Sequence, residues 1–145
     1  MAATLKLEIV TPEGRVFPAT AADGKPEAGD VDMVTLPAIE GEMGILPAHV
    51  PLMTQLTAGE IIVRRGGQDF FLAVGDGFVE VTGERVSILT DMAIKAENID
   101  EVKAEEARQR AEARLAEKLD DAEIASASAA LAHSLAQLKV KRRQR

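Results

Sequence analysis

The sequence predicts an α+β protein, in which an N-terminal antiparallel β-sandwich is followed by a C-terminal antiparallel α-helical hairpin. Two observations support this fold class. Up to about residue 90, short runs of β-type residues alternate with turn residues, and after about residue 96, apolar residues recur at helical spacing. A chain of 145 residues is long enough for one compact domain with an appendage. We therefore expect a sandwich over residues 1–95 and a hairpin over 96–145.

The first strand is predicted from the strict alternation of apolar and polar residues. Leu5, Leu7 and Ile9 alternate with polar residues, which indicates a strand with one buried face. Glycine-containing turns at 65–68, 75–77 and 82–84 separate several of the later runs. Such closely spaced strands are typical of an antiparallel sandwich or barrel, because parallel neighbours need long crossover connections. The further runs expected to form strands are 31–36, 50–56, 60–64, 69–74, 77–81 and 85–89.

Residues 18–29 interrupt this pattern. The segment is rich in Ala, Gly and Pro and lacks large apolar residues, so it cannot bury enough surface to offset the entropy of ordering it. We interpret it as a mobile surface loop. We favour a tolerated insertion over a functional segment, because lengthening a surface loop costs little free energy.

The first helix is expected to start near Ile99. Asn98 and Glu101 have the spacing of a capping box, whereas Asp100 is followed at that spacing by Lys103, which is not acidic. Asn98 is therefore the preferred N-cap. A break between the helices is expected around residues 119–122.

The second helix is expected to bury a stripe of Ile124, Leu131, Leu135 and Leu138. Because its seam with the first helix is rich in alanine, which buries little area, we expect the hairpin to be marginally stable and able to open or dock elsewhere.

Charge is segregated within this hairpin. Residues 97–123 are net acidic, whereas the last seven residues carry five cations and no acid. Two interpretations stay open: a solvated complement to the helix dipole, or docking onto an acidic protein surface. The five cations are Lys139, Lys141, Arg142, Arg143 and Arg145.

Composition excludes several functions. A net charge of −7 and only 3% aromatic residues argue against nucleic-acid binding, which needs cations and stacking surfaces. With no cysteine and only two histidines, His49 and His133, the chain offers a poor set of metal ligands, and we expect no metal site. His133 is interpreted as a partly buried or surface helix histidine.

No sequence pattern for a phosphate loop or a nucleophile elbow is present. Glu40 and Glu42, with His49 nearby, are the one acid–base candidate, but glutamates flanking Gly41 fit an exposed turn better. The chain also has neither a signal-peptide pattern nor an apolar run of membrane-spanning length. We therefore expect a non-catalytic cytosolic protein that meets the membrane only through partners.

Four segments, in order along the chain, resemble the epsilon subunit of F-type (proton-translocating) ATP synthases. EGEMGILPAHVPL at 40–52 is similar to the family's EGE-x-GILPGHAPL element. LTAGEIIV at 56–63 resembles the L-x-PG-x-I-x-V pattern with which the family's next strand begins. The segments 96–115 and 127–140 resemble its two C-terminal helices. The resemblance implies a β-sandwich and helical hairpin without enzymatic activity or cofactor.

This resemblance also implies partners and a location. The subunit would sit on the gamma subunit and the membrane c-ring, as part of the rotating central stalk that couples proton translocation to ATP synthesis. Its location would be peripheral, at the cytoplasmic face of the bacterial inner membrane. The position that contacts the polar loops of the rotor ring corresponds to Glu42, with Glu40, Met43 and His49 as further interface candidates.

For the helices, the resemblance implies that the second one can insert among the alpha and beta subunits and inhibit ATP hydrolysis. The matching basic residues are Lys139, Lys141, Arg142 and Arg143.

An alternative implied function is ATP sensing by the hairpin through an I/L-D-x-x-R-A motif. The corresponding residues are Ile99, Asp100, Lys103 and Ala104, with Arg110 and Arg114 as further phosphate candidates. Lys103 stands where the motif has Arg, and an ammonium group cannot reproduce a planar bidentate fork.

Overall fold

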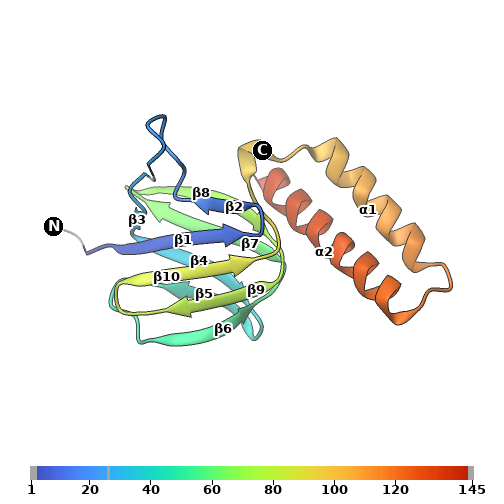
Figure 1. Ribbon diagram of the computed structural model, residues 1–145, viewed down its shortest axis with the longest axis horizontal. Coiled ribbons are helices and arrows are strands. Elements are labelled where there is room, and N and C mark those ends of the chain that lie inside the picture. Colours follow the sequence, from blue (N-terminus) through green and yellow to red (C-terminus); the bar gives the residue numbers. More distant parts are fainter. Residues whose placement is uncertain (1–2, 26, 144–145) are drawn as a thin grey trace.

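The computed structural model describes residues 3–25 and 27–143, and shows a strand-rich part followed by two helices (Figure 1). The strands are β1 Leu5–Thr11, β2 Gly14–Phe17, β3 Asp30–Val31, β4 Met33–Ala38, β5 Gly41–Ile45, β6 Leu52–Leu56, β7 Gly59–Arg65, β8 Gln68–Val74, β9 Gly77–Val81, β10 Arg85–Thr90 and β11 Ala93–Lys95. A 3-10 turn, η1 Ala96–Asn98, precedes α1 Glu101–Leu115 and α2 Asp121–Arg143.

The strands form two layers of one hydrogen-bonded path. Its order is β11-β8-β7-β4-β6-β9-β10-β1-β2, with β3 added to β1 and β5 added to β4. The path passes from one layer to the other at the pair Ala38–Leu56 between β4 and β6. The predicted sandwich with a C-terminal helical hairpin is confirmed.

One pair among the described strands, β1 with β10, is parallel, which the sequence did not predict. These two strands come from opposite ends of the strand-rich part. The strands between them therefore supply the long connection, and no crossover helix is needed.

The core lies between the two layers and is almost entirely aliphatic. Leu5, Leu7 and Ile9 are buried, as their alternation predicted. Val34 and Leu36 of β4 face them within the same cluster of buried residues. Because the chain has only 3% aromatic residues, branched aliphatic side chains carry most of the hydrophobic stabilisation.

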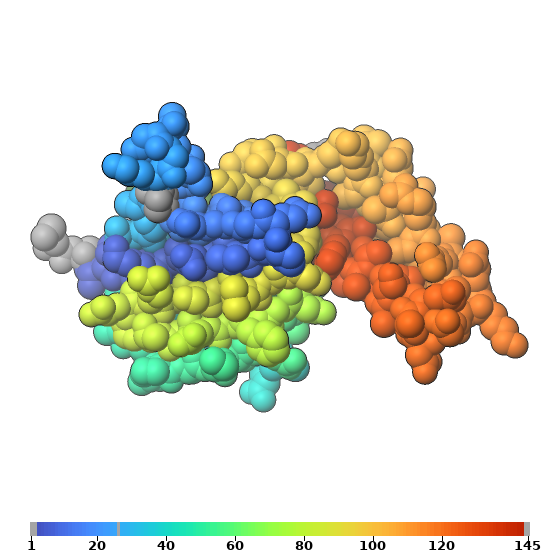
Figure 2. All heavy atoms as spheres, viewed as in Figure 1, coloured from blue at the N-terminus to red at the C-terminus, as the bar shows by residue number. Residues whose placement is uncertain are grey.

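Three strands, β2, β5 and β11, lie outside the predicted runs. In β5 only Ile45 is fully buried, so no alternating pattern marks it. Tertiary pairing with β4, in which Met43 lies opposite Leu36, holds it in place. The segment 18–29 runs between β2 and β3 and projects from the edge of the sandwich (Figure 2), which agrees with its predicted surface position; Pro26 lies outside the described residues.

The helix start differs from the prediction. Asp100, not Asn98, is the N-cap of α1, and its carboxylate accepts a hydrogen bond from the Lys103 amide at 3.1 Å. Ile99 is extended and buried beneath α2, in a second cluster with Ala73 and Val140. Burying Ile99 requires extended backbone there, so the helix can begin only after it.

The break and the buried face of α2 also differ. The connection covers residues 116–120 rather than 119–122. Leu138 is buried as predicted, but Ile124 and Leu135 are 43% and 48% exposed, so the predicted stripe is wrong at those positions. The reason is that α2 packs against α1 and also against β7 and β8. Its buried face is therefore rotated toward smaller residues such as Ala136.

Candidate functional site

The candidate docking loop at 40–51 is a hairpin strand followed by a turn. Glu40 and Glu42 are both exposed, whereas Met43 is partly buried and packs against the sandwich core. Gly41, at the tight turn between β4 and β5, has a φ of 130°, which L side chains rarely adopt. The two carboxylates are thus presented to solvent by a strand that Met43 anchors.

His49 lies at the other end of this segment. Its Nδ1 is 2.7 Å from the carbonyl oxygen of Val50. The preceding Ala48 amide donates to the carbonyl of Gly83 in the β9–β10 turn. Glu40 precedes β5 and Glu42 is its second residue, whereas His49 lies four residues beyond the end of this strand at Ile45. The structure therefore does not assemble these three residues into an acid–base site.

Apolar side chains gather around His49. Leu46, Val50 and Met53 are 56%, 71% and 70% exposed. Exposed apolar groups that cluster in this way mark contact surfaces for other proteins. The loop thus presents two ends with different chemistry: an acidic end at Glu40 and Glu42, and an apolar end around His49.

The four cations of the predicted inhibitory contact lie at the docked end of α2. Arg145, the remaining cation of the basic tail, lies outside the described residues. Arg143 pairs with Glu60 of β7, at 3.2 Å between Nε and Oε1, and its guanidinium lies over the Phe71 ring. The Lys141 ammonium donates to the carbonyl of Ala96. Lys139 is exposed, but its charge acts on the Glu60 carboxyl.

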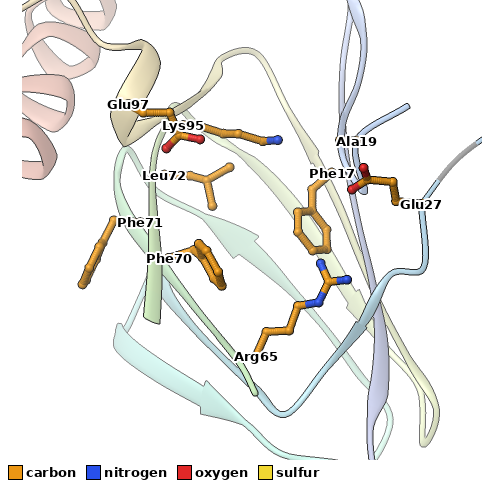
Figure 3. A pocket seen from close by; sticks show the side chains of 9 residues that line it. All are labelled: Phe17, Ala19, Glu27, Arg65, Phe70, Phe71, Leu72, Lys95 and Glu97. Atoms are coloured by element: carbon orange, nitrogen blue, oxygen red, sulfur yellow. The ribbon is translucent and has the colours of Figure 1, made fainter. Parts of the chain in front are cut away.

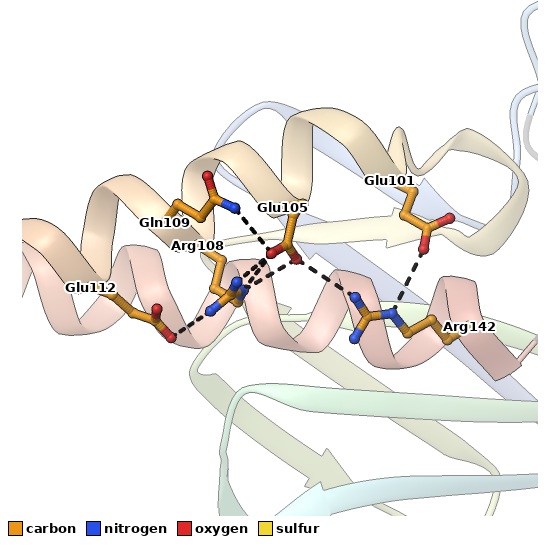
Figure 4. A network of polar contacts seen from close by, with 6 residues as sticks. All are labelled: Glu101, Glu105, Arg108, Gln109, Glu112 and Arg142. Carbon is orange, nitrogen blue, oxygen red and sulfur yellow. Dashed lines mark hydrogen bonds and ion pairs between the residues drawn. The ribbon is translucent and has the colours of Figure 1, made fainter.

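Arg142 instead reaches the acidic helix α1. It lies 3.7 Å from Glu101 and 3.6 Å from Glu105 (Figure 4). Along α1, Arg108 pairs with Glu105 and Glu112. Hydrogen bonding from Arg108 lowers the pKa of the Glu105 carboxyl and raises that of the guanidinium above its usual range. The acidic helix and the basic end of α2 thus neutralise one another within the chain.

Glu60 is the functional residue that sequence reasoning missed. Its side chain is 5% exposed, and burial raises the pKa of the carboxyl although Arg143 and Lys139 lower it. In the sequence, Glu60 stands inside the apolar run GEIIV at 59–63. A carboxylate within a buried strand was the one available signal.

The residues proposed for nucleotide binding are only partly grouped. Ile99 and Ala104 are buried, and Asp100 is used as the helix cap. Lys103 and Arg110 are exposed and lie two turns apart on one face of α1. The side chains of these two cations are accessible to a phosphate group, whereas Ile99, Ala104 and Asp100 stabilise the fold.

A second contact holds α2 on the sandwich. His133 lies 3.2 Å from the carboxylate of Asp91, and the Gln137 amide is 3.9 Å from the sulfur of Met92. His133 is partly buried on its helix, in agreement with the sequence interpretation.

A cavity of about 200 Å³ opens elsewhere, between β2 and β8 (Figure 3). Phe17, Phe70 and Leu72 line it, with Arg65 and Lys95 at its sides. None of the predicted site residues contributes to it.

The described residues contain no cluster of three or more His, Cys, Asp or Glu side chains placed to hold a metal ion. None of the described helices is both long and apolar enough to cross a membrane.

This arrangement, a strand sandwich carrying a docked helical hairpin, defines the class of ATP synthase delta/epsilon chains. The family model described as "ATP synthase, Delta/Epsilon chain, beta-sandwich domain" matches residues 4–96, and the one described as its "long alpha-helix domain" matches 97–142. The chain belongs to the ATP synthase epsilon chain family. It is therefore a non-catalytic subunit of the F-type complex.

Relatives support this assignment along the whole chain. An ATP synthase epsilon chain of Dehalococcoides mccartyi strain BAV1 is 44% identical over 144 residues, covering 99% of this chain and 96% of the relative. That of Bacillus subtilis is 42% identical over 121 residues, covering 83% and 84%.

Solved structures agree. A chain in the Euglena gracilis mitochondrial ATP synthase, solved by cryo-electron microscopy as OSCP/F1/c-ring in rotational state 1, has a TM-score of 0.75 and 26% identity, covering 94% of this chain and 80% of that one. A chain from the central stalk and c-ring structure of Tetrahymena thermophila mitochondrial ATP synthase has a TM-score of 0.61, covering 94% and 96%, and at 12% identity supports the fold alone.

Proposed function

We propose that this subunit couples proton translocation to ATP synthesis by docking its sandwich, residues 1–95, onto the gamma subunit and the c-ring. The observation that carries the proposal is the loop at 40–51, which presents two chemically different ends on a well-anchored strand. A torque-bearing joint needs such anchoring, because a yielding loop would absorb the rotation. The protein would then lie at the cytoplasmic face of the bacterial inner membrane, held there by its partners.

Each end suits a different partner. Glu42 and Glu40 are exposed carboxylates, which suit the polar loops of a rotor ring. The apolar end around His49 suits a permanent interface with the gamma subunit, since the centres of such interfaces are apolar. Met43 supports the acidic end from within the core.

A charge reversal tests the acidic end. Glu42→Lys places a cation where the ring contact is proposed, and we expect ATP-driven proton pumping by membrane vesicles to fall about fivefold, which corresponds to about 1 kcal/mol of lost contact. The matched control is Glu13→Lys, an equally exposed glutamate in the β1–β2 turn. Normal pumping and normal retention of the complex on membranes by the Glu42 variant would remove this residue from the interface.

We further propose that the hairpin, residues 96–145, regulates ATP hydrolysis by carrying its basic end to the alpha and beta subunits. In the docked hairpin, Arg142 and Arg143 are paired with acids of their own chain. The same cations can meet acids of another subunit only after α2 leaves the sandwich. The small buried residues of the α1–α2 seam, Ala104, Ala111 and Ala127, keep the cost of that step low.

Removal of α2 tests this regulation. We expect the assembled enzyme to hydrolyse ATP about two- to fivefold faster when the subunit ends at Asp120, because the inhibitory cations are gone. Lys118→Gln, in the exposed connection between the two helices, removes one cation without touching α2 and should leave the hydrolysis rate unchanged. Equal rates for the truncated and full-length enzymes would contradict the proposal.

Nucleotide sensing through Lys103 and Arg110 stays a prediction. The two exposed cations on one face of α1 are the feature that favours it.

A further inference from the structure

Glu60 is a carboxylate buried where α2 meets the sandwich. It lies on β7 opposite Ala73 of β8, and only 5% of its side chain is exposed. One oxygen, Oε1, pairs with Arg143, whereas Oε2 is buried and has no hydrogen-bond partner among the described residues. An ionised carboxylate held in this way has lost much of its hydration and has regained only one contact.

Three charged groups face this carboxyl. Arg143 and Lys139 approach from α2 and favour the ionised form, whereas Glu42 on β5 disfavours it. Burial is the largest effect and outweighs the two cations, so the pKa of Glu60 lies above its ordinary value when α2 is docked. Arg143 is itself half exposed, so solvent screens its attraction to the Glu60 carboxylate and weakens the ion pair.

We propose that Glu60 makes the docking of α2 sensitive to protons: a protonated Glu60 holds the helix on the sandwich, and an ionised Glu60 weakens that hold. The inference deepens the proposed regulation of hydrolysis, because it names the group that sets how easily α2 leaves. It also assigns opposite roles to the two partners of one ion pair. Arg143 stabilises docking, whereas the charge on Glu60 opposes it.

The direction follows from proton linkage. When α2 leaves, Glu60 meets solvent and its pKa returns to the ordinary range, so the docked state binds protons more tightly than the undocked state. The stabilisation from the neutral carboxyl is complete below the ordinary pKa and is lost as the pH rises through the raised pKa. Docking is therefore weakest where the carboxyl is ionised, above its raised pKa.

Hydrogen exchange in the isolated full-length protein tests this. Amides at the docked end of α2, such as those of Ala136 and Val140, exchange when the helix opens, and their protection after correction for intrinsic rates reports the docking equilibrium. We expect Glu60→Gln to increase protection at pH 7 about threefold to tenfold, although it removes an ion pair. It should also abolish the gain in protection that we expect for the parent as the pH falls through the raised pKa of Glu60 toward the ordinary range.

The partner variant makes the complementary prediction. Arg143→Gln leaves the Glu60 charge buried and unpaired, so protection at pH 7 should fall at least tenfold. Adding Glu60→Gln to that variant should restore it. Arg142→Gln is the matched control, since its partners lie on α1, and it should leave the pH dependence unchanged.

Two further controls keep the result interpretable. All variants carry His133→Asn, because the His133 imidazole meets Asp91 at the same interface and its contact must not contribute to the readout. Amides of the sandwich core, such as that of Ile9, report global unfolding separately. The proposal is overturned if Glu60→Gln reduces protection as Arg143→Gln does, or if the pH dependence survives in Glu60→Gln. Since no ATP hydrolysis enters this experiment, its failure would leave the proposed regulation to its own test.

Discussion

Asp100 sets the start of α1 by satisfying a backbone amide that would otherwise lack a partner. Its carboxylate accepts from the Lys103 amide, as an N-cap does. Asn98, two residues earlier, lies in the 3-10 turn η1. Both residue types cap helices equally well, so local preference could not choose between them; the burial of Ile99 did.

Replacing these two residues separates the alternatives. Asp100→Ala should lower the free energy of unfolding by about 1 kcal/mol, because the cap is lost. Asn98→Ala should change it by less than about 0.5 kcal/mol. Urea unfolding followed by circular dichroism measures both, and a larger loss for Asn98→Ala would show that the helix starts earlier in solution.

At the scale of elements, the period-2 pattern located the strands whose alternate residues enter the core, such as β1 and β10. It failed for β2, β5 and β11, which bury few residues and exist through pairing with a neighbour. The presence of two helices was predictable, whereas the bounds of α1 and the buried face of α2 were not. That face depends on β7 and β8, which lie far away in the sequence.

β9 lies so close to β10 at Gly77 that this position has no room for a side chain. A Cβ at this position would lie 1.9 Å from the carbonyl oxygen of Leu89, which is backbone and cannot move aside. Gly77→Ala should therefore destabilise the sandwich by about 2–4 kcal/mol. Gly83→Ala is the control, because nothing lies within 4 Å of its Cβ. Thermal unfolding of the two variants compares them, and equal melting temperatures would contradict the close approach.

At the scale of the whole molecule, the hairpin covers one end of the sandwich through α2, while α1 lies outside it (Figure 1). This arrangement places the basic end of α2 between two acidic partners, Glu60 on the sandwich and the acids of α1. The docked hairpin therefore engages Arg142 and Arg143, two of the cations proposed to inhibit hydrolysis, in ion pairs within the chain. Docking and inhibition compete for the same side chains, and the protonation of Glu60 shifts that competition.

The sequence by itself determined the fold class, the aliphatic core and the family, because alternation, helical spacing and motifs can be recognised in residues close together in the chain. It also placed Glu42 and His49 in one loop. Only the tertiary structure decided that Glu42 lies near the start of β5 whereas His49 lies beyond its end, and that Arg143 meets Glu60. Both outcomes depend on strand register and helix docking, which bring together residues far apart in the chain and which no local pattern encodes.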